Sequence, residues 1–295
     1  MLEPDIQSFW TAHPCGDNIF GRPGGDQRQD YEEFFSRYDA AKYRLEKHIP
    51  ACLAKLDVDG RRVLEIGLGQ GSEAELLIRR GARWTGVDLT ETAVHRTGTR
   101  LAVRGLPFDD LRQASVLDLP FPDRSFDVVF SHGVLHHVPD IHRAQREIHR
   151  VLKPDGELVV MLYARWSLNY LLSIRLLRRA ALLAAYPLVR SGIVPQPDGL
   201  LGAHLQNARR YGLLPYLRPS TFLHHNTDGP NNPYSRVYDR WRVRDDFPNF
   251  SVRRMEKWFM HAPPLPVHGL PGARALGWHL WAHLAPRCDR TTRGE

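Results

Sequence analysis

Short apolar runs alternate with longer segments of helical spacing between residues 61 and 164. The short runs predict strands, and the segments whose apolar positions recur every three or four residues predict helices. This alternation is typical of a mostly parallel sheet covered by helices. The expected strands are residues 61–67, 84–89, 111–117, 126–130 and 156–163, and the expected helices are residues 72–80, a segment that opens at Thr90 or Thr92, and residues 140–152.

The pattern changes on both sides of this block. Residues 1–30 are rich in Pro, Gly and Asp and predict an irregular arm, whereas residues 31–56 predict a helix with one apolar face. After the block come an amphipathic helix and then a stretch rich in Pro, Gly and Asn. Residues 251–260 and 276–285 predict two last strands.

These segments predict an α/β fold, a three-layer Rossmann-like sandwich around a mostly parallel seven-stranded sheet, with an N-terminal helical lid and an inserted cap. We expect four parts. They are an arm and lid helix at residues 1–57, a cofactor-binding core at 58–164, a cap with substrate residues at 165–245, and the strands that complete the sheet at 246–295.

A glycine-rich turn, Gly67-Leu68-Gly69-Gln70-Gly71, joins the first expected strand to the first helix. Glycines let the backbone turn tightly and approach a ligand without a Cβ in the way. Asp88 ends the second expected strand, where a carboxylate can accept both hydroxyls of a ribose. Asp118 ends the third, where an adenine amino group would lie. The turn and the two acids together predict a site for an adenosine-containing cofactor.

This ordered series of motifs resembles the class I S-adenosylmethionine-dependent methyltransferases, of the small-molecule type often called methyltransferase type 11. The resemblance covers about residues 58–164 and is specific for the fold and the cofactor. The matching motifs are residues 65–71, 86–89, 115–121, 126–137 and 147–158.

The resemblance implies S-adenosyl-L-methionine as the cofactor and assigns contacts to it. The three glycines approach its methionine part, Asp88 takes the ribose, and Asp118 serves the adenine. The remaining residues expected at the cofactor are Glu65 beneath the glycine-rich loop, Gln70 within it, Leu89 and Leu119 beside the adenine, and Ser131 near the sulfonium. Tyr31 on the lid helix offers a ring that can stabilise a sulfonium by cation–π contact.

Methyl transfer mainly requires alignment of the reactants and removal of water. A base is needed only when the nucleophile still carries a proton. His132 and His136 follow the fourth expected strand and are the candidate catalytic bases, because imidazole titrates near neutral pH; His137 beside them is a third candidate. Catalysis by proximity alone is the alternative.

Residues 224–238 form a polar stretch that is too varied for a flexible linker. Segments that follow the fifth strand of such sheets can fold back over the mouth of the site. We therefore expect Asn226, Tyr234, Arg236 and Tyr238 to line the acceptor or cofactor pocket, and an ordinary ordered surface loop is the alternative.

Composition narrows the partners. The chain has 295 residues, a formal charge of +7 and three cysteines without a paired spacing, which argues against a disulfide scaffold and favours the cytoplasm. Residues 165–295 hold 19 Lys or Arg and 8 Asp or Glu, yet no nucleic-acid motif is present, and no ligand set predicts a metal.

Three arginines interrupt the apolar stretch 168–189, so we expect no stable membrane insertion. That stretch predicts packing on the core or in a homodimer, and contact with an anionic membrane surface is the alternative.

The expected function is transfer of a methyl group from S-adenosylmethionine to an O or N atom of a small-molecule acceptor, in specialised metabolism. The closest alternative is attack at the γ-carbon of the cofactor, by aminocarboxypropyl transfer or cyclisation, which releases methylthioadenosine. A non-catalytic cofactor-binding protein is the second alternative.

Overall fold

Seven strands form one sheet in the computed structural model, which describes residues 2–17, 21, 23–25 and 27–287. The order across the sheet is β3-β2-β1-β4-β5-β7-β6. The strands are β1 (Arg62–Ile66), β2 (Arg83–Asp88), β3 (Asp110–Gln113), β4 (Phe126–His132), β5 (Leu152–Tyr163), β6 (Phe250–Trp258) and β7 (His279–Pro286). Strand β7 runs antiparallel to both of its neighbours, and the other pairs are parallel. The predicted fold class is therefore confirmed.

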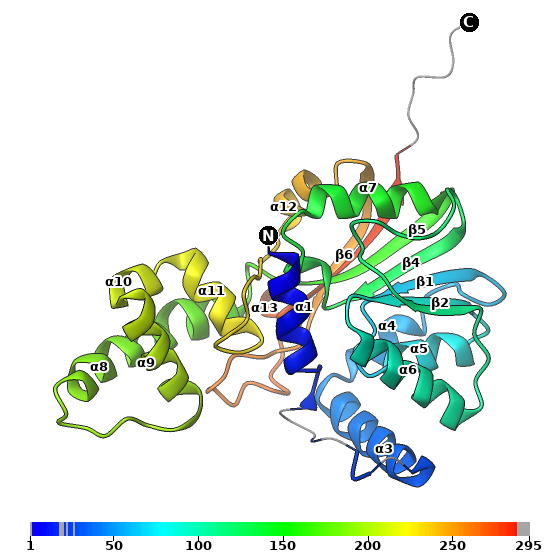
Figure 1. Cartoon of the computed structure of the whole chain (residues 1–295). Coiled ribbons are helices and arrows are strands. Elements are labelled where there is room, and N and C mark those ends of the chain that lie inside the picture. The colour runs from blue at the N-terminus through cyan, green and yellow to red at the C-terminus, as the bar shows by residue number, and fades with distance from the viewer. Residues whose placement is uncertain (1, 18–20, 22, 26, 288–295) are drawn as a thin grey trace, which may run out of the picture.

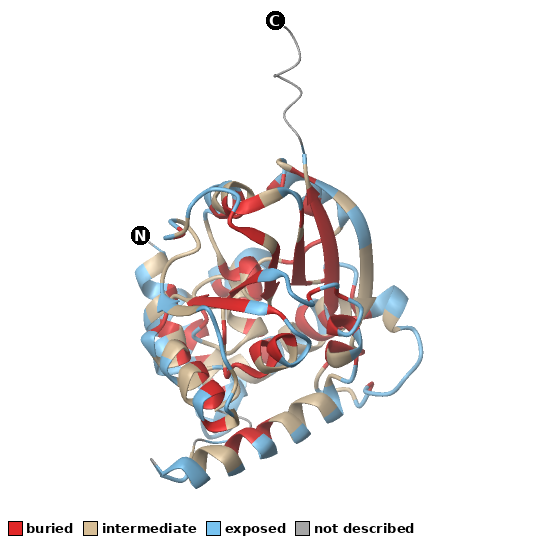
Figure 2. Cartoon of the chain, turned by 90° about the vertical axis from the view of Figure 1, so that its right-hand side faces the viewer, coloured by how far each residue is buried: buried red, intermediate tan, exposed pale blue. Residues whose placement is uncertain are grey.

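Helices cover both faces of the sheet (Figure 1). One face packs against α4 (His48–Leu53), α5 (Ser72–Arg79) and α6 (Glu91–Arg104), and the other against α7 (Ile141–Val151) and α12 (Arg240–Asp246). Helix α7 shows why the helices pack against the sheet. Its residues Ile141, Ala144 and Ile148 recur on one face and are fully buried, so the helix gains its stability by burying that stripe. Figure 2 shows the strands as the buried centre of the molecule.

The N-terminal segment departs from the prediction. Residues 1–30 are not wholly an irregular arm, because α1 (Glu3–Ala12) is helical. Its sequence carries start signals, with Pro4 in the first turn and Glu3 and Asp5 beside it. Ile6 and Phe9, three positions apart, are its buried residues. The predicted helix 31–56 is divided into α3 (Arg28–Leu45) and α4.

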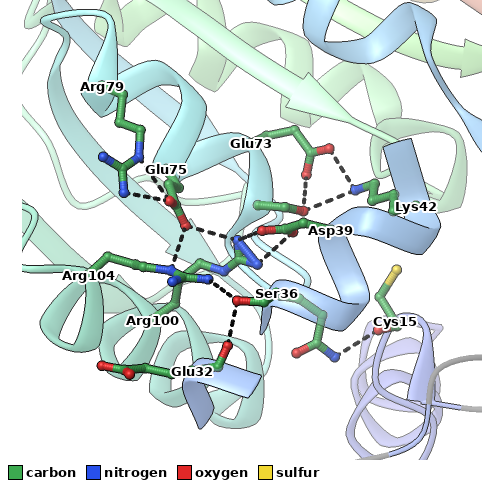
Figure 3. A network of polar contacts seen from close by, with 12 residues as sticks. Cys15, Glu32, Ser36, Asp39, Lys42, Glu73, Glu75, Arg79, Arg100 and Arg104 are labelled. Carbon is green, nitrogen blue, oxygen red and sulfur yellow. Dashed lines mark hydrogen bonds and ion pairs between the residues drawn. The ribbon is translucent and has the colours of Figure 1, made fainter. Parts of the chain in front are cut away.

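Buried ion pairs attach α3 to the core (Figure 3). The guanidinium of Arg100 on α6 is fully buried and donates to both oxygens of Asp39 at 2.9 and 2.7 Å, and to Glu75 at 3.2 Å. It also lies 4.6 Å from the ring centroid of Phe35. The Nζ atom of Lys42 lies 2.6 Å from Glu73 at the start of α5. Helix α3 is thus held over the helices that follow the glycine-rich turn and β2.

The inserted cap begins with the expected amphipathic helix, and the stretch rich in Pro, Gly and Asn that follows also contains helices. It comprises η2 (Asn169–Leu177), α8 (Arg178–Arg190), α9 (Gly199–Tyr211), α10 (Leu213–Tyr216) and α11 (Pro219–Thr227). These helices bury a small apolar cluster of their own, which includes Leu182, Leu205 and Phe222. They extend to the side of the sheet (Figure 1). The α13 turn (Ala273–Leu276) precedes the last strand.

None of the helices in the described ranges is both long and apolar enough to cross a membrane.

Candidate active site

A cavity lies where β1, β2 and β4 end at their carboxyl edge, which is where parallel α/β sheets bind ligands. The wall on the sheet side includes Gly67, Gly69 and His132. The opposite wall belongs to α1 and the turn after it, through Ile6, Trp10 and Cys15 among others. The cavity is thus enclosed between the sheet edge and the N-terminal helix.

The backbone of the glycine-rich turn adopts angles that favour glycine at three positions. Gly67, Gly69 and Gly71 have φ angles of 81°, 54° and 72°, which L side chains rarely adopt. A Cβ on Gly67 would also lie 2.1 Å from Val134 Cγ2. The predicted turn therefore forms against the loop that follows β4. Gly67 and Gly69 line the cavity, and Gly71 instead packs against Thr97.

Asp88 lies in the cavity wall at the end of β2, as predicted. Its Oδ2 accepts from the Leu68 amide at 2.8 Å, and its Oδ1 accepts from the amide and hydroxyl of Thr90, each at 2.8 Å. Burial raises the pKa of Asp88 above its usual range, although these hydrogen bonds oppose the shift. The carboxylate joins the glycine-rich turn to the loop after β2, and Leu89 beside it also lines the cavity.

The far end of the cavity is formed by Ala114, Ser115 and Val116 rather than by the residues expected at the adenine. Strand β3 ends at Gln113, earlier than predicted, so Asp118 does not end it. Asp118 is exposed, and Leu119 is buried with its amide donating to Glu147 at 3.0 Å. Neither lines the cavity, so their assignment to the adenine is not supported.

Two predicted cofactor residues lie behind the wall. Glu65 is 1% exposed and its Oε2 accepts from the indole N–H of Trp84 at 2.7 Å. Burial raises the pKa of Glu65 well above its usual value. The hydroxyl of Ser131 donates to the Ile66 carbonyl at 3.0 Å. Both side chains connect neighbouring strands beneath the glycine-rich turn, and neither lines the cavity.

His132 is the candidate base that lines the cavity. Its Nε2 atom is buried and has no hydrogen-bond partner among the described residues. Burial lowers the pKa of His132 to about 4, and Lys42 also lowers it while Glu73 opposes the shift. The imidazole is therefore neutral at physiological pH, and its ring belongs to the cavity wall.

His136 does not line the cavity, so its prediction as a catalytic base is not supported. The residue is fully buried, and its ring centroid lies 3.8 Å from that of Tyr163. Burial lowers the pKa of His136 well below its usual value. Its surroundings are those of a packed core residue on the short helix η1 (Leu135–His137).

His137, the third candidate, lines the cavity, and both of its ring nitrogens lie near oxygen atoms. Nδ1 lies 2.7 Å from the Tyr234 carbonyl, and Nε2 lies 3.2 Å from Asp228 Oδ2. The other carboxylate oxygen of Asp228 accepts from the hydroxyl of Tyr163 at 2.7 Å. This cluster joins the loop after β4, the end of β5 and the end of the cap. It positions the His137 ring at the cavity wall.

Contacts at three points hold α1 and the turn after it over the site. The side-chain amide of Gln7 donates to the Leu89 carbonyl at 3.0 Å, and the ring centroids of Trp10 and His137 lie 5.3 Å apart. Gln70, predicted to touch the cofactor, instead donates to the Cys15 carbonyl at 2.8 Å. Glu3 and Ile6, within the segment that the sequence predicted to be an irregular arm, also line the cavity.

The predicted substrate residues lie elsewhere. None of the four lines the cavity, so the prediction is not supported by the described residues. Asn226 is buried and accepts from Arg178, while Tyr234 stacks on His224 at 5.1 Å. The guanidinium of Arg236 donates to Asp246 at 3.1 Å, and buried Tyr238 pairs through its backbone with residues 163–165.

Tyr31 also lies outside the main cavity, beside a second, more open pocket that includes Glu91, His95 and Arg96. Its ring centroid lies 5.9 Å from that of Phe35. The proposed contact between Tyr31 and a sulfonium therefore has no support from this arrangement.

A search of the described residues finds no group of three or more His, Cys, Asp or Glu side chains that could hold a metal ion.

The fold and the cavity define an α/β protein with a nucleotide-type site at the switch between β1 and β4. Residues 64–160 match the family model described as a methyltransferase domain. The chain therefore carries a class I S-adenosylmethionine-dependent methyltransferase domain, and the resemblance seen in the sequence is confirmed. The cofactor of this class is S-adenosylmethionine. The residues present fit it, because a turn that excludes side chains, a partly buried carboxylate and the neutral ring of His132 border one cavity.

Curated relatives match only part of this chain. The fatty-acid O-methyltransferase of Mycolicibacterium smegmatis is 40% identical over 105 residues, which are 35% of this chain and 37% of the relative. The phosphatidylethanolamine N-methyltransferase of Cereibacter sphaeroides is 35% identical over 109 residues, or 37% of this chain and 53% of the relative. The matched region thus spans about two fifths to one half of these relatives.

Solved structures share the fold over more of the chain. The geranyl diphosphate C-methyltransferase of Streptomyces coelicolor has a TM-score of 0.54 at 15% identity and covers 97% of each chain. An S-adenosylmethionine-dependent methyltransferase of Mesorhizobium loti has a TM-score of 0.51 at 19% identity, covering 80% of this chain and 96% of that one.

Proposed function

We propose that this protein transfers the methyl group of S-adenosylmethionine to an O or N atom of a small-molecule acceptor. The observation that carries the proposal is the single cavity that joins the glycine-rich turn and Asp88 to His132 beneath α1. The family match and the relatives that act on small molecules support it. A role in specialised metabolism and a location in the cytoplasm belong to the same proposal.

The chain's own residues provide binding and alignment. The glycine-rich turn leaves room for close approach, and the Asp88 carboxylate is placed to accept hydrogen bonds from ribose hydroxyls. When bound, S-adenosylmethionine supplies an activated methyl group on a sulfonium. Helix α1 closes the opposite side with Ile6 and Trp10, which removes water from the region between cofactor and acceptor.

The walls favour an acceptor with an apolar body. Ile6, Trp10, Val134 and Val138 all border the cavity. An apolar ligand gains free energy by leaving water for such a wall, at roughly 25 cal/mol for each Å² of apolar surface buried. The names of two relatives, a fatty-acid O-methyltransferase and a sterol 24-C-methyltransferase, refer to apolar acceptors and agree with this preference.

His132 serves as a hydrogen-bonding group and not as a strong base. With a pKa of about 4, its imidazole is a poor match for removing a proton at neutral pH. A neutral imidazole has one N–H donor and one acceptor nitrogen, so the ring can instead donate to a carboxylate or accept from an amine and orient it. We therefore infer that the acceptor atom reaches the site already unprotonated, as a carboxylate or an amine, and that alignment provides most of the rate.

The test is mass spectrometry of reactions that contain the full chain, S-adenosylmethionine and a set of fatty acids and lipophilic amines. We expect S-adenosylhomocysteine and a methylated acceptor in equal amounts. Methylthioadenosine in place of S-adenosylhomocysteine would show attack at the γ-carbon and overturn the proposal. Binding of the cofactor without turnover of any acceptor or extract would favour a non-catalytic protein.

Two variants test whether the activity depends on the cavity that contains Asp88. Asp88→Asn should lower kcat/KM by about one to two orders of magnitude, because it weakens charge-assisted hydrogen bonds worth about 1.5–3 kcal/mol each. Asp118→Asn is the matched control, since this acid is exposed and lies outside the cavity. Equal activity of the two variants would contradict the assigned site.

A further inference from the structure

The cap has an unusual surface for a group of packed helices. Every exposed position from 176 to 188 carries an apolar residue, and Leu176, Leu183 and Leu188 are 59%, 48% and 43% exposed. These positions lie on the outward side of η2 and α8, because Leu182 and Val189 on the opposite side are buried in the cap's own cluster. Apolar side chains that face water along a helix are typical of a surface that binds something.

The loop between α8 and α9 continues this apolar surface. Ile193 and Val194 are 72% and 40% exposed, and Leu200 at the start of α9 is 67% exposed. We call the six residues with these exposed side chains the cap surface, namely Leu176, Leu183, Leu188, Ile193, Val194 and Leu200. The helices that carry it project away from the sheet (Figure 1).

Arginine dominates the charge of the segment that carries the cap surface. Residues 166–227 contain seven arginines, no lysine and a single acid, Asp198. Arg175, Arg190 and Arg210 are exposed, and within the described ranges none of the seven arginines forms an ion pair with a carboxylate. Apolar side chains with unpaired guanidinium groups beside them match the boundary of a bilayer, where acyl chains meet phosphate groups.

We propose that the cap surface docks on the face of an anionic phospholipid bilayer. The leucines and Ile193 enter the headgroup region while the arginines bind lipid phosphates. A second copy of the chain fits less well, because a two-fold contact would bring two surfaces of the same strong positive charge together. The docking is peripheral, since the described helices are too short or too polar to cross the membrane. This property is separate from methyl transfer and does not depend on it.

Vesicle flotation of the purified full chain tests the proposal. We expect binding to phosphatidylcholine–phosphatidylglycerol vesicles, weak binding to phosphatidylcholine alone, and a loss of binding as salt is raised. The combined variant Arg175→Gln, Arg190→Gln and Arg210→Gln should bind about a hundredfold more weakly, because each cation near an anionic surface contributes about fivefold.

A matched pair of variants tests the apolar part. Leu183→Glu should weaken binding by about tenfold or more, since it removes a leucine that enters the membrane and adds a repelled carboxylate. Leu45→Glu at the end of α3 is the control, because Leu45 is 47% exposed but lies outside the cap. Circular dichroism and cofactor binding verify that each variant is folded.

Three results would overturn the proposal. The first is no preference for anionic vesicles over phosphatidylcholine. The second is equal weakening by Leu183→Glu and Leu45→Glu. The third is a wild-type dimer in light scattering that Leu183→Glu converts to a monomer, which would show that a second copy covers the cap surface.

Discussion

The buried guanidinium of Arg100 makes a strong prediction about how α3 is held. Its side chain is fully buried, and Asp39 accepts two of its hydrogen bonds. Replacing Asp39 with Ala leaves that charge in the interior with Glu75 as its remaining carboxylate partner. Removal of one partner from a buried ion pair costs about 3–5 kcal/mol, because the remaining charge has lost its compensation.

This cost is large compared with a total stability of about 5–15 kcal/mol for a folded domain. We therefore expect Asp39→Ala to lower the unfolding free energy in urea by about 3 kcal/mol, the lower end of that range, because Asp39 is partly exposed and Glu75 remains. The double variant Asp39→Leu with Arg100→Met should recover much of the loss, since it removes both charges and keeps apolar volume.

A surface ion pair provides the control. Arg83 and Asp109 lie 3.1 Å apart with side chains 60% and 40% exposed, and Asp109→Ala should cost less than about 1 kcal/mol. The assay is urea unfolding followed by tryptophan fluorescence and circular dichroism. A loss below about 1 kcal/mol for Asp39→Ala, or no recovery in the double variant, would refute the reasoning.

Two further predictions concern the glycine-rich turn and pH. Gly67→Ala should abolish cofactor binding, because the φ of 81° and a Cβ placed 2.1 Å from Val134 both oppose it. Gly105→Ala, which meets no atom within 4 Å at a φ of 63°, should cost only about 1 kcal/mol in an unfolding titration. Burial raises the pKa of Glu46 from 4.5 to about 7, so the folded protein retains a proton that the unfolded chain releases in this window. The unfolding free energy should therefore fall by at most about 3 kcal/mol as pH rises from 4.5 to 7, and Glu46→Gln should flatten that part of the pH profile.

The central part of the fold could be predicted because its signals are local. The run of residues 61–71 contains a strand, a glycine-rich turn and a helix start within a few positions, and Asp88 follows at the end of the next strand. The structure places Gly67, Gly69, Asp88 and His132 around one cavity. In each case the end of a strand fixed the position of the residue.

The remaining site depends on contacts that no local pattern reveals. His137 lies beside Asp228, which is at the end of the cap and 91 positions further along the chain. The cavity is closed by α1, a helix that buries only two residues and so has a weak apolar pattern in the sequence. The third strand ends earlier than its β-rich sequence indicates. Residues 114–116 therefore form the cavity wall at the place where the sequence predicted Asp118. The cap residues that the sequence predicted at the substrate instead form hydrogen bonds within the cap and the core.

Isothermal titration calorimetry with S-adenosylhomocysteine tests the central claim most directly, because it measures the cofactor site without any knowledge of the acceptor. We predict binding by the wild-type chain, at least about tenfold weaker binding by Asp88→Asn, and unchanged binding by Asp118→Asn. Unchanged affinity in Asp88→Asn, or a loss in Asp118→Asn, would contradict the placement of the cofactor in this cavity.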